Sequence, residues 1–453
     1  MDTSKHPDFL EILQRANFDF NPFFHTISQE IHLPFSYEDY RNSVRHQASF
    51  LHEYTHLVQA LSTTYGVYSF VGLSERFALF FNAVQGRAEL SFPIVEWASH
   101  EVDDEALGAF AKYESHYQVQ RAASDGTWKV APTVSGDDFS LCQESKDVGG
   151  KLLKRWHVVR RTDVGAVAIP LLGVCLSEAQ AECVAAYFYD SSSELLERED
   201  RKQDEKSIIY TSVNGLVRRL LPNYPTLEAT YFLTEYALMT YVPDVAFVRG
   251  IEFLEKRSPP TTIGEWNSAW MDLDNSLDGY GKKSVDDLLN GIDRKIALFG
   301  RYVGNIIVEL LVHRLMMCRS LVLLKSQNPF QFFPWERTTE WLERELLQHI
   351  PVTAAHFTDG IHALGSPRPD DIQKQATLSA VAFLLAVLRE KKPAECPRFA
   401  SASCTAVRTL DCKQFPWGRG DVGGGRTCLH GALGIVLGIA SSSLSSVSAR
   451  YKP

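Results

Sequence analysis

Residues 51–57 read LHEYTHL and contain the pattern H-E-x-x-H. On a helix, two histidines four residues apart lie one turn apart on the same face, so the imidazoles of His52 and His56 can reach one metal ion. Glu53 lies between them, on the side where a metal-bound water would lie, and is a candidate general base. The stretch therefore predicts a zinc site carried by a helix.

The residues around this pattern favour such a helix. No proline or glycine occurs from Ser49 to Thr64. Apolar side chains recur at helical spacing along one face, at Phe50, Tyr54, Leu57 and Leu61. A second, polar face carries His52, His56, Gln59 and Thr63. A two-faced helix suits a metal site between packed subdomains, although histidines here are also compatible with an ordinary core or surface role.

Composition excludes some classes of function. The chain has 453 residues, 45% of them hydrophobic, and a formal net charge of −9. Its basic residues are dispersed, which argues against nucleic-acid binding. Residues 1–24 lack the apolar segment of a signal peptide, and the longest apolar runs, 165–176 and 429–440, are too short to span a bilayer. We expect a cytoplasmic protein that binds neither nucleic acid nor membrane.

Four of the eight cysteines fall in one stretch near the C-terminus: Cys396, Cys404, Cys412 and Cys428. In a reducing compartment such a cluster favours metal over disulfides. The spacing is looser than a C-x2-C knuckle, so a second, structural Zn²⁺ and four free thiols are both open. Cys175 and Cys183 lie in apolar sequence and are expected to be core residues.

Hydrophobic periodicity and chain breakers predict a mainly α protein (α+β), with a small sheet near the active-site cleft and a Cys-containing C-terminal segment. Residues 23–34 predict a strand or hairpin. Residues 152–161 predict a strand, which as an edge strand would pair with an extended peptide. The expected parts are a core at 1–255 with an insertion at about 86–160, a helical domain at 256–392, a Cys-rich segment at 393–440 and a disordered tail at 441–453.

A catalytic zinc site needs a third protein ligand. A third histidine at the spacing H-E-x-x-H-x-x-G-x-x-H is absent, because Gln59 stands at the glycine position and Ser62 at the histidine position. We therefore expect a carboxylate from another helix. Two candidates are Glu75, in the sequence LSERFA, and Glu178, in the sequence SEAQAE.

These motifs resemble the gluzincin metallopeptidases, the thermolysin-like superfamily whose zinc ligands are H-E-x-x-H and a helical glutamate. LSERFA is similar to the LNEGFA motif of the aminopeptidase branch, which would make Glu75 the ligand. SEAQAE is similar to the thermolysin pattern N-E-x-x-x-D, in which Glu178 would be the ligand and Glu182 the partner of a ligand histidine. The motif region is also similar to a group of uncharacterised bacterial H-E-x-x-H proteins. The resemblance implies a zincin-like helical core and peptidase activity.

Small side chains favour Glu178 over Glu75. The helix that carries Glu178 is expected to approach the histidine helix closely because its residues include Ala179, Ala181, Ala185 and Ala186. Glu182, one turn further on, can accept the other ring N–H of a ligand histidine and so fix its tautomer. Glu75 stays open as the alternative, but its neighbour Arg76 offers it a surface salt bridge. The long separation from the histidines counts against Glu178.

The leading hypothesis is a zinc-dependent metallopeptidase that hydrolyses a peptide or protein substrate. His52, His56 and Glu178 would hold Zn²⁺, and Glu53 would act as general base on a zinc-activated water. Weak candidates for stabilising the oxyanion are His157, Tyr231 and Tyr236. One alternative is a non-catalytic, zinc-stabilised interaction protein. Another is a latent protease activated by a regulatory protein partner, with the polar segments 86–150 and 191–207 covering the cleft.

Overall fold

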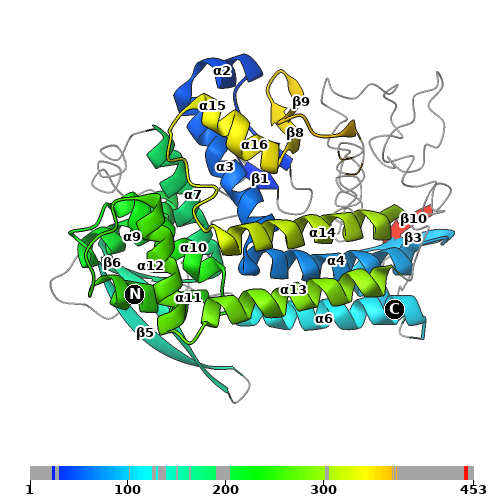
Figure 1. Cartoon of the computed structure of the whole chain (residues 1–453). Coiled ribbons are helices and arrows are strands. Elements are labelled where there is room, and N and C mark those ends of the chain that lie inside the picture. The colour runs from blue at the N-terminus through cyan, green and yellow to red at the C-terminus, as the bar shows by residue number, and fades with distance from the viewer. Residues whose placement is uncertain are drawn as a thin grey trace.

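The helix that carries the H-E-x-x-H pattern, α3 (Val44–Ser62), lies at the centre of a mainly helical chain in the computed structural model (Figure 1). The predicted fold class, mainly α with a small sheet, is confirmed, and the described residues form three small sheets rather than one. The structure describes residues 23–25, 30–101, 103–124, 129–130, 139–148, 151–162, 165–189, 205–300, 306–369, 371, 374 and 443–446. Among the helices so described, none combines the length and the apolar character needed to cross a bilayer.

Four long helices lie side by side at one end of α3 (Figure 1). They are α4 (Thr64–Val84), α6 (Glu105–Ser124), α13 (Tyr280–Phe299) and α14 (Ile306–Gln327). Both α4 and α14 contact α3. The short helices α2 (Tyr37–Asn42) and α5 (Ile94–His100) pack on α3 and α6, respectively.

A second group of helices surrounds α7 (Gly173–Tyr189), which packs along α3. The helices α9 (Glu205–Leu220), α10 (Thr226–Leu238) and α11 (Pro243–Leu254) contact α7, and α12 (Ile263–Ser276) packs on α10. Helix α10 is buried from Ala229 to Leu238; most of these side chains are apolar, and the charged Glu235 is paired with Lys325. The chain then passes through α15 (Thr339–Trp341), a π-helical turn (Leu342–Leu346) and α16 (Leu347–His349). Tyr54 of α3 donates its hydroxyl to the carbonyls of Leu346 and Ile350, which anchors this segment to the motif helix.

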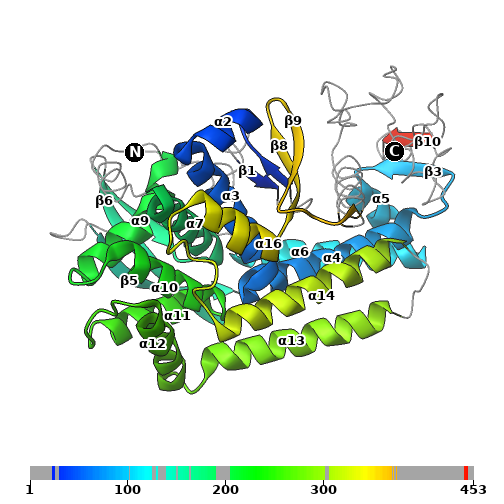
Figure 2. The same ribbon diagram turned by 45° about the horizontal axis from the view of Figure 1, so that its top comes forward.

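One sheet joins strands from residues 23–32 and 352–364, which lie far apart in the sequence. Its strand order is β1 (Phe23–His25), β2 (Glu30–His32), β8 (Val352–Phe357) and β9 (Gly360–Leu364). Strands β1 and β2 form the predicted hairpin, β2 pairs with β8 in parallel, and β8 and β9 form a second hairpin. Figure 2 shows the sheet beside α3. Strands β8 and β9 lie in the range 256–392 that was expected to be helical, and an Asp-Gly turn with Gly360 at φ +155° joins them.

A separate antiparallel sheet has the order β4 (Lys129–Val130), β7 (Gly165–Pro170), β6 (Lys151–Thr162) and β5 (Phe139–Val148). The strand predicted at 152–161 is therefore present as β6. The idea that it is an edge strand for substrate is wrong, because β5 and β7 take up the hydrogen-bonding groups on both of its sides.

A short parallel pair involves the C-terminal segment. Strand β10 (Ser443–Ser446) pairs with β3 (Glu89–Phe92). Disorder was expected throughout 441–453, and the expectation is wrong for these four residues, since the ladder with β3 orders them.

The turn between α3 and α4 is unusually tight. Thr63 ends α3, where its N–H and its hydroxyl both donate to the Gln59 carbonyl, and its hydroxyl then accepts the N–H of Gly66 to cap α4. A Cβ at Gly66 would lie 2.1 Å from the Gln59 carbonyl oxygen and 2.7 Å from Cα of Ala60. Glycine is therefore required for the two helices to meet at this angle.

We expect Gly66→Ala to lower the free energy of unfolding by about 1–3 kcal/mol, since the new methyl group meets backbone that cannot yield without separating the helices. Urea unfolding followed by circular dichroism measures the change. The matched control is Gly291→Ala on α13, where an added Cβ meets nothing within 4 Å and should stabilise the helix by about 0.5–1 kcal/mol. Equal effects of the two substitutions would contradict this account of the turn.

Candidate metal centre

Helices α3 and α7 bring three potential metal ligands to one point. His52 and His56 project from α3 toward α7, which carries Glu178. The Oε2 atom of Glu178 lies 3.2 Å from His56 Nε2 and 3.6 Å from His52 Nε2. Ala179 and Ala181 of α7 are fully buried, consistent with the close packing of the two helices that small side chains predict.

The second nitrogen of each ring faces a different partner. His52 Nδ1 lies 3.5 Å from Glu182 Oε2, and His56 Nδ1 lies 2.9 Å from Gln59 Oε1. Both partners can accept an Nδ1–H, and this tautomer leaves the two Nε2 lone pairs directed at the point where Glu178 lies. The arrangement orients both rings for a shared ligand.

The charges of these groups are strongly coupled. Burial alone would lower the pKa of His52, but Glu178 and Glu182 raise it well above its ordinary value. Burial likewise opposes protonation of His56, whose pKa Glu178 nevertheless raises. Burial would raise the pKa of the Glu178 carboxyl, but the neighbouring His56 and His52 hold it far below its usual range. The Glu178 carboxylate is therefore ionised, and it favours a positive charge beside it, on the histidine rings or on a bound cation.

These residues fit a zinc ion. One nitrogen from each histidine and one oxygen from Glu178 lie within 4.8 Å of one another. The Oε2 atom of Glu178 is buried and accepts no hydrogen bond, so its lone pairs are available to a cation. Two imidazoles and one carboxylate are a donor set of catalytic zinc sites, which keep a fourth position open for water.

Glu53 and Glu75 occupy very different surroundings. Glu53 is 6% exposed on α3, and its charge raises the pKa values of both His52 and His56, which indicates a carboxylate close to the two rings. Glu75, the alternative ligand, forms an ion pair with Lys295 of α13. The structure thus brings Glu178 to the histidines and Glu75 to a different helix.

The expected pairing of Glu75 with Arg76 is wrong. Arg76 turns into the core and forms a bidentate, buried ion pair with Glu114 of α6. The carboxylate of Glu75 instead reaches α13, because α13 packs beside α4.

The weaker candidates take other roles. The Tyr231 hydroxyl donates to the Pro329 carbonyl at 3.3 Å, and the Tyr236 hydroxyl donates to Asp274 Oδ1 at 3.0 Å. His157 is buried within β6. Cys175 and Cys183 are fully buried, as predicted. The four clustered cysteines, Cys396, Cys404, Cys412 and Cys428, lie outside the described residues, as does the larger part of the polar segment 191–207.

A chain of buried polar side chains extends from His56 into the core. The Gln59 amide accepts from His56 Nδ1 and from the Ser177 hydroxyl, and it donates to the Ser177 carbonyl at 2.9 Å and to Gln180 Oε1 at 2.7 Å. Gln180 in turn donates to Glu235 Oε2 at 2.9 Å. Every polar atom of the Gln59 amide is occupied, so the orientation of this side chain is fixed.

This network of hydrogen-bonded side chains ends at an ion pair between Glu235 of α10 and Lys325 of α14. The Lys325 Nζ atom lies 2.7 Å from Glu235 Oε2, and the two side chains are 1% and 0% exposed. Sequence reasoning missed Gln180, Glu235 and Lys325. Their only signal is a polar residue within an apolar helix, and nothing local indicates that the three meet.

A small cavity of about 10 Å³ adjoins this network on the neighbouring face of α3. Its lining includes Thr55, Gln180, Tyr231 and Lys325. The volume has room for one water molecule, so the cavity is too small to hold a peptide.

We expect Glu182→Gln to weaken zinc binding by about 10- to 100-fold, because a neutral amide holds the Nδ1–H of His52 less strongly and lowers the basicity of its Nε2. Competition with a chromogenic chelator measures the affinity. Glu75→Gln is the matched control and should leave zinc affinity unchanged, since Glu75 pairs with Lys295. A loss of zinc in the control variant would instead favour Glu75 as the ligand.

Comparisons of this chain with protein-family models, with curated proteins and with solved structures found no match. The centre is therefore interpreted from its own geometry. That geometry is a pair of histidines on one helix, a carboxylate on a second, and a separate accepting partner for the far nitrogen of each ring.

Proposed function

We propose that the chain is a zinc-dependent metallopeptidase whose centre is formed by His52, His56 and Glu178. The observation that carries the proposal is the convergence of both Nε2 atoms on Glu178 Oε2 while both Nδ1 atoms are held by other residues. If the two histidines only packed against α7, their Nε2 atoms would not need to face one carboxylate while their Nδ1 atoms bonded to other residues. Zinc is the metal that this donor set favours.

A bound zinc ion supplies a Lewis acid that lowers the pKa of a coordinated water and polarises a carbonyl oxygen. In this proposal, Glu53 takes a proton from the nucleophilic water and returns it to the leaving amine. Its negative charge raises the pKa of both His52 and His56. Glu182 and Gln59 keep both rings in the orientation that presents Nε2.

Removal of the metal tests the proposal. We expect the zinc-loaded chain to cleave members of a mixed peptide library, to lose this activity after dialysis against a chelator, and to regain it with one equivalent of zinc. Mass spectrometry of the library identifies new termini. Cleavage that survives complete metal removal would contradict the proposal, and circular dichroism of the metal-free chain separates lost chemistry from lost folding.

The burial of the centre favours a second candidate function, a zinc brace between α3 and α7. The four side chains around the centre, His52, His56, Glu178 and Glu182, are only 14–17% exposed. A metal there would cross-link two packed helices and stabilise the fold by mass action. In that case chelation would lower the melting temperature, and the zinc-loaded chain would leave every peptide intact.

A further inference from the structure

A second group of potential ligands lies on the sheet formed by β1, β2, β8 and β9. Side chains alternate between the faces of a strand, so Glu30 and His32 of β2 share one face while Ile31 points to the other. Ile31 is fully buried and packs into the core. The parallel register sets His32 beside His356 of β8, which adds a third polar side chain to the same face.

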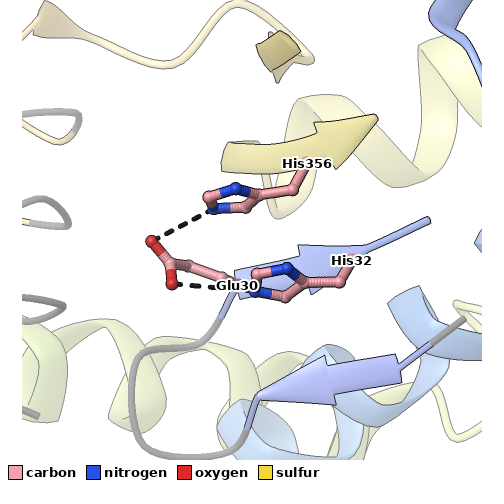
Figure 3. A group of neighbouring side chains, drawn as sticks. All are labelled: Glu30, His32 and His356. Atoms are coloured by element: carbon pink, nitrogen blue, oxygen red, sulfur yellow. Dashed lines mark ion pairs between the residues drawn. The ribbon is translucent and has the colours of Figure 1, made fainter. Parts of the chain in front are cut away.

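The three side chains are close together (Figure 3). The Glu30 carboxylate lies between the two rings, with Oε1 3.4 Å from His356 Nε2 and Oε2 3.9 Å from His32 Nε2. The rings are stacked, with centroids 4.2 Å apart and an interplanar angle of 11°. One ligand atom from each residue lies within 4.8 Å of the other two.

The surroundings of the group are suited to an ion entering from solvent. The side chains of Glu30, His32 and His356 are 12%, 30% and 24% exposed, so the group is recessed but reachable. The Nε2 atom of His356 is itself buried and makes no hydrogen bond. A buried ring nitrogen without a hydrogen bond is costly unless something else satisfies it, and the carboxylate at 3.4 Å is too far away for a strong bond.

We propose that Glu30, His32 and His356 bind a second divalent transition-metal ion, zinc by ligand preference. Two imidazoles and a carboxylate are the same donor set as in the first centre, and they suit zinc better than calcium or magnesium, which prefer oxygen. The near-parallel rings direct their Nε2 atoms side by side. Metal binding therefore tilts the rings apart until both lone pairs meet the ion, a motion that their partial exposure permits.

The site has a structural consequence that the first centre lacks. Its ligands come from β2 and β8, two strands joined by only a short parallel ladder. An ion held by both strands would link the N-terminal hairpin to the β8–β9 hairpin. Since α3 contacts β1 and β2, the same link would hold the sheet in place beside the H-E-x-x-H helix.

Zinc stoichiometry of the full chain tests the inference. We expect the wild-type chain, dialysed against buffered zinc and analysed for metal, to hold roughly two zinc ions, and His356→Ala and Glu30→Gln to hold roughly one. Glu30→Gln keeps the size and hydrogen-bonding capacity of the side chain, so it remains informative if the histidine variant folds poorly. In a His56→Ala background, which removes a ligand of the first centre, one zinc should remain and should raise the melting temperature.

His362→Ala is the matched control. His362 lies on the adjacent strand β9 with similar exposure, but it is stacked on Tyr37 and stands opposite Ala355, on the other face of the sheet. This variant should keep both ions. The second site is overturned if His356→Ala and Glu30→Gln still hold two ions. It is also overturned if the wild-type chain holds a single ion and His56→Ala abolishes its binding. If the second site exists and the first does not, zinc will be lost with Glu30→Gln but not with His56→Ala.

Discussion

Glu53→Gln is expected to lower the rate of peptide hydrolysis by about 10²- to 10⁴-fold while the zinc content stays at the wild-type level. The amide has nearly the size of the carboxylate, so the packing of this buried side chain is retained. It cannot accept a proton from water at neutral pH, so the general-base step is lost. Initial rates on a cleaved peptide, together with metal analysis of the same sample, measure the two quantities.

Glu178→Ala provides the contrast to this variant. Glu178 Oε2 is the atom on which both Nε2 atoms converge, so its removal should empty the centre and abolish hydrolysis together. The two variants therefore separate the two roles. Glu53→Gln should keep its zinc and lose hydrolysis, whereas Glu178→Ala should lose both. Hydrolysis within a few-fold of wild type in Glu53→Gln would exclude the general-base role.

Lys325→Met is expected to lower the free energy of unfolding by about 3–5 kcal/mol, because it leaves the Glu235 carboxylate buried without its counter-charge. Both side chains of this ion pair are almost completely buried between α10 and α14. Methionine fills most of the volume of the lysine chain, so the loss arises mainly from charge rather than from a cavity. Urea unfolding followed by circular dichroism gives the free energy.

The double variant Glu235→Gln with Lys325→Met is the control for this effect. A glutamine at position 235 removes the charge and still accepts from Gln180 Nε2, so most of the lost stability should return. If the single and double variants are equally unstable, packing and not charge explains the loss. The prediction is contradicted if the midpoint of urea unfolding is the same for Lys325→Met as for the wild-type chain.

The parts of the centre that the sequence predicts are those determined within one helix. The spacing of His52, Glu53 and His56 fixes their relative positions as soon as the helix forms. The choice of Glu178 rested on the small residues beside it, and the structure brings Glu178 and Glu182 to the two rings. The role of Gln59 was not predicted, although its position one turn from His56 places it next to the ring.

Contacts between distant segments could not be predicted. Glu75 was the alternative ligand by motif, and its pairing with Lys295 follows from the packing of α13 beside α4, which the sequence does not reveal. The strands β8 and β9 were missed because their alternation is short and a β-bulge interrupts it. In the second group, the sequence E-x-H of residues 30–32 indicates two side chains on one face of a strand. The third member, His356, lies more than 300 residues later and joins them only through the pairing of β2 with β8.

The parallel pairing of β2 with β8 means that the sheet cannot be completed during synthesis until β8 has been made. The backbone N–H of Tyr37, just after β2, bonds to Asp359, 322 residues later. Helices α3 and α7 are both complete by residue 189, so the first centre can assemble while the remainder is still being translated. At about 5–20 residues per second, β8 follows roughly ten to thirty seconds after α7. During that interval the edge of β2 that later pairs with β8 is unpaired, and an unpaired edge can pair with another chain and promote aggregation.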